Sequence, residues 1–308
     1  MEKEQENNYH KINLNWYPGH MAKSKKQIIS DLKIVDLIVE VLDARAPKSS
    51  HNPDVDEYCK NKKRIVVLNK TDLADEKITD EWVEYFKGKN IVAVKTQANT
   101  SKNSNNLLSE IKIQGNSIRE SYAKKGRTGY YIKVMIVGIP NVGKSTIINN
   151  ISKRKSQKVE NRPGVTQKNQ WISIDDNIEL LDTPGMFSPR FKNENTANVL
   201  SFLNTIGSNA VDNEEVAYNL LNFLINNYKE NLENRYNITI SQNENGEYDL
   251  EEVITEIAKK VGALLSGNKI NEEKVSNIIL RDFRTGKLGR ISLEKPEKEE
   301  LIWIFLIN

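Results

Sequence analysis

Short apolar runs alternate with amphipathic segments up to about residue 190. Four runs rich in Val, Ile and Leu have the pattern of buried parallel strands, at residues 34–44, 64–70, 90–96 and 131–139. Between them, residues 78–86 and 107–122 carry apolar residues at helical spacing. Residues 170–174 and 178–183 flank a short polar turn and predict an antiparallel hairpin at the sheet edge. We therefore expect an α/β domain with a mostly parallel sheet and helices on both faces.

The apolar positions change to a helical period after about residue 190. Three predicted helices have apolar faces formed by Val216, Leu220, Leu221 and Leu224, by Val253, Ile257, Val261 and Leu264, and by Val275, Ile278, Ile279 and Phe283. These helices predict a second, smaller all-α domain. The expected organisation is an α/β domain over residues 1–190, a helical domain over 191–292 and a C-terminal tail over 293–308.

The composition narrows the function classes without identifying one. The 308 residues include one cysteine and three histidines, which predict neither an intrachain disulfide nor a metal cluster. No apolar run is long enough to cross a bilayer, and the polar N-terminus resembles neither a signal nor a transit peptide. We expect a cytoplasmic protein without a membrane partner. Basic clusters in a chain of net charge +3 leave a polyanionic partner open.

The sequence G-I-P-N-V-G-K-S-T at residues 138–146 fits the pattern of a phosphate-binding P-loop. It follows a predicted strand and precedes an apolar helix, which is the context that the motif requires. Backbone N–H groups of such a loop surround phosphates at a helix N-terminus, the lysine neutralises phosphate charge, and the hydroxyl can bind Mg²⁺. The predicted phosphate-binding residues here are Gly138, Asn141, Val142, Gly143, Lys144, Ser145 and Thr146.

Two later segments carry the chemistry expected around a terminal phosphate. In D-T-P-G at 182–185, Asp182 ends an apolar strand and can bind Mg²⁺, while the Gly185 N–H can reach a phosphate. Thr166 follows a Pro-Gly turn between the P-loop and D-T-P-G, where a switch threonine would also reach Mg²⁺. The predicted magnesium ligands are therefore Ser145, Thr166 and Asp182.

The sequence L-N-K-T-D at 68–72 predicts a guanine-reading loop after an apolar strand. Asp72 can accept hydrogen bonds from the N1–H and the 2-amino group of guanine, and adenine offers no 2-amino group. Asn69 would brace the loop, and the stem of Lys70 would lie over the base. Thr96 follows the next strand, where a base-contacting S-A-K motif is expected. The sequence V-K-T-Q-A-N at 94–99 matches that motif poorly.

The five sequence elements of a GTPase are all present: two base-reading segments, the P-loop, and two switch segments at Thr166 and at D-T-P-G. Both base-reading segments precede the phosphate-binding ones. This order resembles the circularly permuted GTPases of the YlqF/YawG family, most closely the bacterial ribosome biogenesis GTPase A type. The segments N-W-Y-P-G-H-M (15–21), V-L-D-A-R-A-P-K-S-S-H-N-P (41–53) and R-D-F-R-T-G-K-L-G-R (281–290) strengthen the resemblance, which covers about residues 13–291. A permutation can keep a site intact when the original termini lie close together.

The resemblance implies a circularly permuted P-loop GTPase domain followed by a helical RNA-binding domain. The implied activity is GTP hydrolysis stimulated by the large (50S) ribosomal subunit during its assembly. The implied partners are GTP, GDP, the 50S subunit and its rRNA, and we expect a monomer. The family likeness favours a bacterial source but leaves an organellar one open.

Met186 occupies the position at which many GTPases carry a water-orienting glutamine, so another group must position the attacking water. The resemblance implies that His20 takes this catalytic role, and the alternative is a histidine that only packs in the structure. Asn141 is expected to help hold K⁺, which would place positive charge where an arginine finger otherwise acts. The alternative for Asn141 is a residue that braces the loop.

In the helical domain, the RNA-binding candidates recur every three residues: Arg281, Arg284, Lys287 and Arg290. Such a basic stripe suits rRNA phosphates, although Gly286 and Gly289 favour a loop over a continuous helix. The alternative is an ordinary charged surface.

Two rival functions stay open at this stage. The first is a GTP-gated RNA or protein scaffold with little intrinsic catalysis, which Met186 favours. The second is a P-loop small-molecule kinase, which the N-K-T-D segment disfavours.

Overall fold

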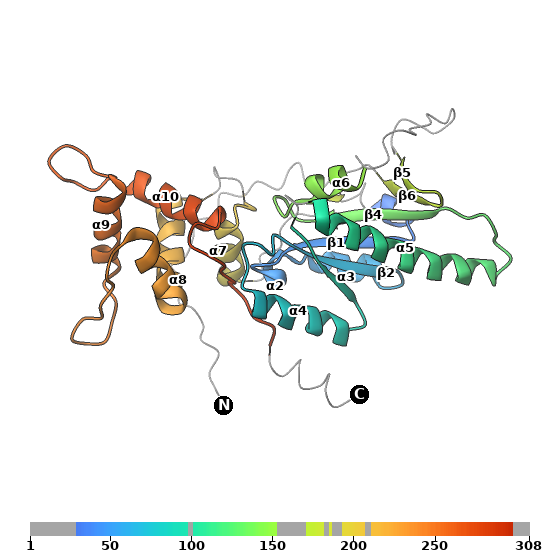
Figure 1. Ribbon diagram of the computed structural model, residues 1–308, viewed down its shortest axis with the longest axis horizontal. Coiled ribbons are helices and arrows are strands. Elements are labelled where there is room, and N and C mark those ends of the chain that lie inside the picture. The colour runs from blue at the N-terminus through green and yellow to red at the C-terminus, as the bar shows by residue number, and fades with distance from the viewer. Residues whose placement is uncertain are drawn as a thin grey trace. The chain divides into compact units, whose positions relative to one another are not determined.

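The computed structural model describes residues 29–97, 101–152, 171–181, 185–186, 193–206 and 211–297 (Figure 1). These residues form two compact units. The first comprises the described residues up to 186 together with residues 292–297, and the second comprises those from 193 to 291. Within the described ranges, none of the helices combines the length and apolar composition that a bilayer crossing requires.

The first unit is built on a mostly parallel sheet. Its strands are β1 (Leu37–Asp43), β2 (Lys63–Asn69), β3 (Val92–Lys95), β4 (Ile132–Gly138), β5 (Trp171–Asp175), β6 (Ile178–Leu181) and β7 (Gly185–Met186). The order across the sheet is β3-β2-β1-β4-β6-β5, and the short β7 pairs with β4. Neighbouring strands run parallel except β5 and β6. The expected α/β class and the antiparallel hairpin at the sheet edge are both confirmed.

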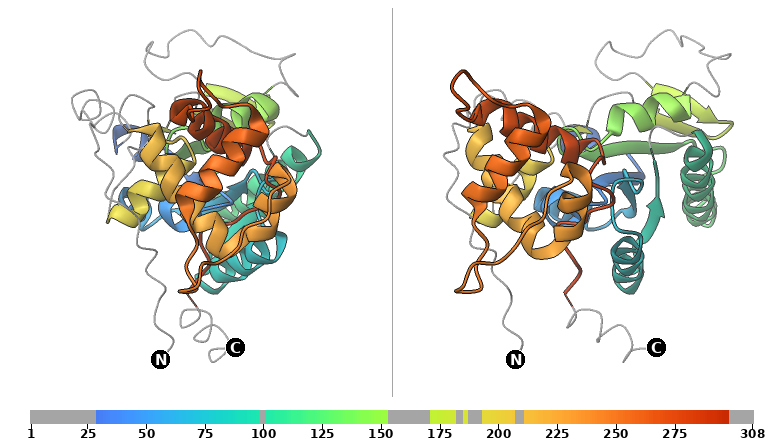
Figure 2. Two further views of the ribbon diagram at one scale, coloured as in Figure 1. Left: turned by 90° about the vertical axis from the view of Figure 1, so that its left-hand side faces the viewer. Right: turned by 60° about the vertical axis from the view of Figure 1, so that its left-hand side comes forward.

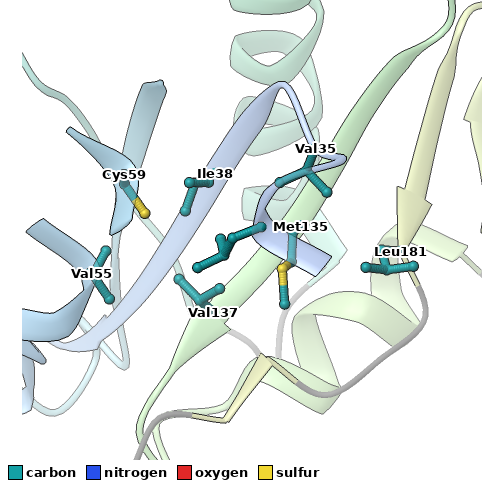
Figure 3. Packing of buried hydrophobic residues seen from close by; sticks show 8 residues of the cluster. Val35, Ile38, Val55, Cys59, Met135, Val137 and Leu181 are labelled. Carbon is teal, nitrogen blue, oxygen red and sulfur yellow. The ribbon is translucent and has the colours of Figure 1, made fainter. Parts of the chain in front are cut away.

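Helices cover both faces of this sheet (Figure 1). They are α2 (Pro47–Ser50), α3 (Pro53–Cys59), α4 (Glu76–Gly88), α5 (Ser101–Ala123) and α6 (Lys144–Ser152). On one face, Val55 and Cys59 of α3 belong to a cluster with Ile38 and Met135 (Figure 3). On α5, a Cβ at Gly115 would lie 3.6 Å from Ile132. Ile132 and Met135 point to opposite faces of β4 because side chains alternate along a strand.

Helix α4 shows how local sequence determines one of these elements. The Asp75 side chain accepts a hydrogen bond from the Ile78 N–H, which caps the helix N-terminus. Ile78, Trp82 and Phe86 follow at helical spacing and are buried against Leu42 and other residues of β1 and β2. Burial of each large side chain contributes about 1.5–3 kcal/mol.

A segment at the C-terminal end of the described chain, Ser292–Glu297, packs on the first unit. The Leu293 N–H donates to the Arg45 carbonyl at 2.7 Å, and the Asp75 N–H donates to the Ser292 hydroxyl at 3.1 Å. The Glu294 carboxylate accepts hydrogen bonds from the N–H and hydroxyl of Ser49. Burial raises the pKa of the Glu294 carboxyl, against the opposing effect of the Ser49 hydrogen bonds. The sequence contained no signal for this docking.

The second unit consists of α7 (Glu194–Phe202), α8 (Asn213–Tyr236), α9 (Leu250–Val261) and α10 (Glu272–Arg284). Asparagine or aspartate caps each N-terminus through a side-chain oxygen, which accounts for where these helices begin. Helix α8 contacts the three others (Figure 2). The Arg235 guanidinium on α8 donates to the fully buried Asp282 of α10, with an Nε–Oδ2 distance of 2.8 Å.

One detail of the predicted helices is wrong. Leu264 was assigned to the apolar face of the second predicted helix, but α9 ends at Val261. Gly262 takes the left-handed conformation with φ 66°, which ends the helix in the way glycine commonly does. Leu264 instead forms an antiparallel bridge with Ile270, and its side chain is 37% exposed.

Candidate nucleotide-binding site

The predicted P-loop begins at the end of β4 and leads directly into α6. Gly138 ends the strand with φ 151°, and a Cβ at this position would lie 2.6 Å from the Val41 carbonyl oxygen. A glycine is therefore required for the close approach of the loop to β1. Asn141 and Gly143 also have positive φ, at 61° and 101°. These conformations bend the chain around the helix N-terminus, where backbone N–H groups can bind phosphates.

Lys144 is the first residue of α6 and is buried, with 5% of its surface exposed. Its ammonium donates to the Ile139 carbonyl, so the side chain folds back across the loop. Burial lowers the pKa of Lys144 to about 8. A nearby phosphate would favour the charged form and raise this pKa again. Ser145 and Thr146 follow on the first turn of α6 and are exposed.

Strand β7 brings the end of the D-T-P-G segment to the start of the P-loop. Gly185 pairs with Val137, and Met186 pairs with Gly138. The backbone of Gly185 therefore lies beside the strand that carries the phosphate-binding loop. The other residues predicted for the phosphate and metal chemistry, His20, Thr166 and Asp182, lie outside the described residues.

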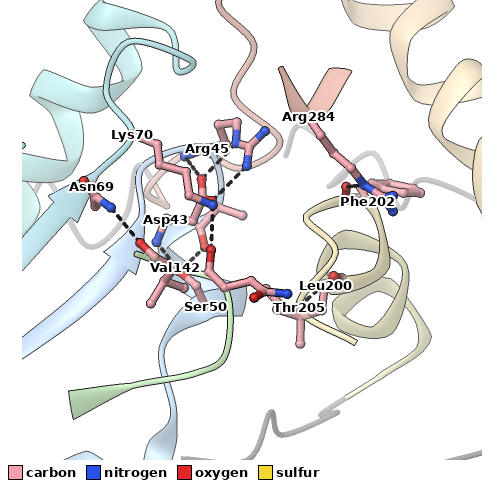
Figure 4. A network of polar contacts seen from close by, with 12 residues as sticks. Asp43, Arg45, Ser50, Asn69, Lys70, Val142, Leu200, Phe202, Thr205 and Arg284 are labelled. Carbon is pink, nitrogen blue, oxygen red and sulfur yellow. Dashed lines mark hydrogen bonds and ion pairs between the residues drawn. The ribbon is translucent and has the colours of Figure 1, made fainter. Parts of the chain in front are cut away.

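The predicted guanine loop follows β2 and is tied to the P-loop by two side chains (Figure 4). The buried Asn69 amide donates to the Val142 carbonyl at 2.7 Å. The Lys70 ammonium donates to the Asn141 carbonyl at 2.8 Å, and Lys70 itself has φ 62°. These two bonds place the end of β2 beside the phosphate-binding loop, although the two segments are 71 to 73 residues apart in the chain.

Thr96 supports the same loop from the end of β3. Its hydroxyl donates to the Asn69 side-chain oxygen at 3.0 Å, and its carbonyl accepts from the Thr71 N–H at 3.2 Å. Thr96 is 3% exposed, so its hydroxyl acts inside the protein, whereas Asp72 of the same loop is exposed. The Asp72 carboxylate is therefore accessible to a base, while the buried Thr96 holds the loop that carries it.

Two residues that the sequence analysis did not assign to the site complete this network. Asp43 ends β1, is fully buried, and accepts hydrogen bonds from the Lys70 ammonium at 2.8 Å and the Arg45 guanidinium at 2.9 Å (Figure 4). Burial alone would raise the pKa of Asp43, but Arg45 and Lys70 hold it well below its usual range. The signal was present in V-L-D-A-R, because an acid and a base directly after a buried strand must find partners.

The four RNA-binding candidates do not form one helical stripe. Helix α10 ends at Arg284, and the next turns contain Gly286 and Gly289 with φ of 76° and 86°. The Arg284 guanidinium donates to the carbonyls of Ser201 and Phe202 at 2.8 and 2.9 Å, where it stabilises the end of α7 (Figure 4). Arg281 and Lys287 are 59% and 51% exposed at their side chains, and Arg290 is exposed as well.

Of the magnesium ligands predicted from the sequence, only Ser145 lies within the described residues. Within those residues, no cluster of three or more histidine, cysteine, aspartate or glutamate side chains could hold a metal. The exposed Ser145 hydroxyl does lie on the first turn of α6, directly after the loop shaped by Gly138. A hydroxyl at this position, supplemented by the substrate's phosphate oxygens, is a donor set that suits Mg²⁺. The Ser145 hydroxyl therefore fits the ion.

The fold and the site together define a P-loop GTPase whose predicted guanine loop precedes its phosphate-binding loop in the chain. A family model described as 50S ribosome-binding GTPase matches residues 133–260. Ribosome biogenesis GTPase A from Priestia megaterium is 39% identical over 293 residues, covering 94% of this chain and 99% of the relative. This protein belongs to the ribosome biogenesis GTPase A family.

Solved structures agree with this assignment. A GDP-bound structure of YlqF is 28% identical, with a TM-score of 0.63, and the match covers 88% of this chain and 99% of that one. A second structure, GNP-bound YlqF from Thermotoga maritima, is 28% identical with a TM-score of 0.60, covering 89% and 99%. The family assignment and the permuted order inferred from the motifs are thereby confirmed.

Proposed function

We propose that this GTPase acts as an assembly factor for the large ribosomal subunit and couples its nucleotide state to binding of that subunit and its rRNA. The observation that carries the nucleotide part is the pair of hydrogen bonds from Asn69 and Lys70 to the P-loop carbonyls. They bring the proposed guanine-reading loop beside the proposed phosphate-binding loop. The names of the family model and of the relatives support the ribosomal part.

In the proposed site, each half of the nucleotide has its own residues. Asp72 accepts from the guanine N1–H and 2-amino group, and the Lys70 stem lies along the base. Backbone N–H groups of Val142, Gly143 and neighbouring P-loop residues bind the phosphates, together with the Lys144 ammonium and the Gly185 N–H. The site discriminates against adenine because adenine has no 2-amino group to donate a hydrogen bond to Asp72.

Ser145, Thr166 and Asp182 are the residues proposed to hold Mg²⁺, which would neutralise charge that develops on the phosphate oxygens. His20 is proposed to orient the attacking water, because the apolar Met186 cannot. Asn141, whose side chain is exposed, is the proposed contributor to a K⁺ site.

Arg281, Lys287 and Arg290 are the proposed rRNA contacts, and Arg284 has a structural role in the same unit.

The proposed function is tested by GTP hydrolysis measured with and without purified 50S subunits, in KCl and in NaCl. Stimulation by 50S subunits, larger in KCl, is the expected result. Binding of 50S subunits without stimulation would instead support the scaffold function that Met186 favours. Equal rates in the two salts would remove the K⁺ role of Asn141.

The role of His20 is tested in the same assay. His20→Ala should reduce the stimulated rate on the order of a hundredfold, the usual contribution of a positioned acid–base group, while GDP affinity stays unchanged. Wild-type hydrolysis by this variant would assign His20 a packing role only.

A further inference from the structure

The buried carboxylate of Asp43 lies at the junction between the guanine loop and the core of the sheet. Its two oxygens accept hydrogen bonds from Lys70 and from two guanidinium nitrogens of Arg45, all at 2.8–2.9 Å. Asp43 and Arg45 are 0% and 2% exposed. The Asp43 N–H donates to the Ser50 hydroxyl at 3.1 Å, so the backbone at the end of β1 is held as well.

Lys70 is held at two points by this arrangement. Its ammonium lies 2.8 Å from the Asp43 carboxylate oxygen and 2.8 Å from the Asn141 carbonyl oxygen. Its backbone is in the left-handed region at φ 62°, which a lysine adopts only when its surroundings compensate the strain. With both ends determined, the methylene stem between them has little freedom left. A flexible lysine would otherwise lose side-chain entropy when a base binds along it.

We propose that Asp43 is a positioning residue for guanine recognition, and that it acts by holding Lys70 in the conformation that receives the base. Arg45 orients the Asp43 carboxylate through its paired hydrogen bonds. This inference rests on the proposed assignment of Lys70 and Asp72 to guanine binding. It extends that site beyond the N-K-T-D loop, to Asp43 at the end of β1 and Arg45 directly after it.

A purely structural role for Asp43 makes different predictions. If Asp43 only neutralises the buried Arg45, its loss lowers stability and the fraction of active protein, and it leaves the KM for GTP unchanged. If Asp43 positions Lys70, its loss raises the KM for GTP and leaves kcat nearly unchanged, because base contacts are equal in the ground and transition states.

The test is a double-mutant cycle on the dissociation constant for GDP, with Asp43→Asn and Lys70→Met made singly and together. Each single variant should raise the Kd on the order of tenfold, the expected effect of losing a charge-assisted hydrogen bond. The double variant should lose no more than about twofold beyond Lys70→Met, because Asp43 acts through Lys70. Losses that multiply to about a hundredfold, or a wild-type Kd for Asp43→Asn, would overturn the proposal.

Asp36→Asn is the matched control. Asp36 immediately precedes β1 at its opposite end, and its carboxylate accepts hydrogen bonds from the Tyr122 hydroxyl and the Lys133 N–H at 2.8 and 2.9 Å. This variant should leave the Kd for GDP unchanged.

Asp43→Asn could be too unstable to purify. In that case Asp43→Glu keeps a charge for Arg45 but displaces the carboxylate by one methylene group. It should raise the KM for GTP severalfold at an unchanged kcat, and a wild-type KM would overturn the proposal. A wild-type Kd for both Lys70→Met and Asp72→Asn would refute the guanine site itself, which is distinguishable from failure of the Asp43 cycle alone.

Discussion

The two halves of the proposed nucleotide site are shaped by different parts of the protein. The phosphate half is shaped by backbone: Gly138, Asn141 and Gly143 adopt positive φ, and a strand and a helix flank them. The guanine half is shaped by side chains, since Asn69 and Lys70 reach across to P-loop carbonyls, with Thr96 and Asp43 holding them in place. The phosphate half can be recognised from one motif, whereas the guanine half combines the N-K-T-D motif with residues at the ends of two other strands.

This difference explains why the order of the two halves along the chain can change. The guanine loop is joined to the P-loop by hydrogen bonds between side chains and carbonyls, and those bonds require proximity and not chain continuity. The parallel order β2-β1-β4 places the ends of the relevant strands at one edge of the sheet. A permuted chain that keeps this order keeps the site.

The largest expected effect is on the backbone-shaped half. Gly138→Ala places a Cβ 2.6 Å from the Val41 carbonyl oxygen at a φ that alanine rarely adopts. We expect the free energy of unfolding to fall by about 4 kcal/mol, from combined strain and overpacking. GDP binding should be lost. Urea denaturation and GDP titration measure the two effects.

Gly115→Ala is the control for this substitution. Gly115 is in helix α5, and its added Cβ would meet Ile132 and Ile178 at an ordinary 3.6 Å. Alanine should be neutral or should stabilise the helix by up to about 1 kcal/mol. Equal losses for the two variants would show that the close approach at Gly138 does not determine the loop.

The next effect is on the side-chain-shaped half. Asn69→Ala leaves the Val142 carbonyl and the Thr96 hydroxyl without their buried partner. The expected loss is about 2–3 kcal/mol of unfolding free energy, the cost of unsatisfied buried groups. The Kd for GDP should also rise, because the guanine loop loses its bond to the P-loop. An unchanged Kd in a destabilised variant would show that the two halves of the site bind GDP without this bond between them.

The charged side chains of His51, Asp56 and Glu40 form a cluster on the same unit. Substitution of His51 tests whether such a side-chain network affects GDP binding or only stability. Burial lowers the pKa of His51, but its hydrogen bonds to Asp56 and Glu40, both 2.7 Å, raise it to about 9. A raised pKa stabilises the fold fully below the unfolded value near 6.5, and this contribution is lost as the pH rises through 9.

His51→Gln should therefore cost about 2 kcal/mol at pH 6, with a difference from wild type that shrinks toward pH 10. His51→Arg carries its charge at every pH, so its stability should not decline over this range. Urea denaturation at several pH values measures both variants. A pH-independent loss for His51→Gln would remove the charge argument. GDP affinity should not change, because the side-chain partners of His51 are Glu40 and Asp56, and neither belongs to the two loops.

The smallest expected effect is at Thr96. Thr96→Val removes one hydrogen bond to Asn69 and should cost about 1 kcal/mol while raising the Kd for GDP a fewfold. Thr79→Val, on α4, removes a comparable buried hydroxyl that donates to the Asp75 carbonyl. It should cost similar stability and leave GDP affinity unchanged. The same Kd for both variants would mean that Thr96 contributes only to the fold.

The strands, the hairpin and the P-loop context could be predicted because each depends on local sequence. Apolar runs identify strands, and glycines at fixed spacing identify a loop with positive φ. The end of α9 was missed because Val261 and Leu264 have helical spacing, while the conformation of Gly262 decided the boundary.

Contacts between distant segments could not be predicted in the same way. The docking of Ser292–Glu297 depends on groups such as the Arg45 carbonyl, which has no sequence signature. The structural role of Arg284 depends on carbonyls of Ser201 and Phe202, more than 80 residues away. The sequence V-L-D-A-R indicates that Asp43 and Arg45 need partners, but the place of Asp43 beside Lys70 emerges only once the sheet order is known.

The proposed site joins a guanine-reading Asp72 to the P-loop in permuted order. Comparing the Kd of wild type and of Asp72→Asn for GDP and for xanthosine diphosphate tests this site directly. Xanthine replaces the 2-amino donor of guanine with a carbonyl acceptor, so an asparagine amide can pair with it and a carboxylate cannot. Asp72→Asn should therefore prefer xanthosine diphosphate. An unchanged preference for GDP would contradict it.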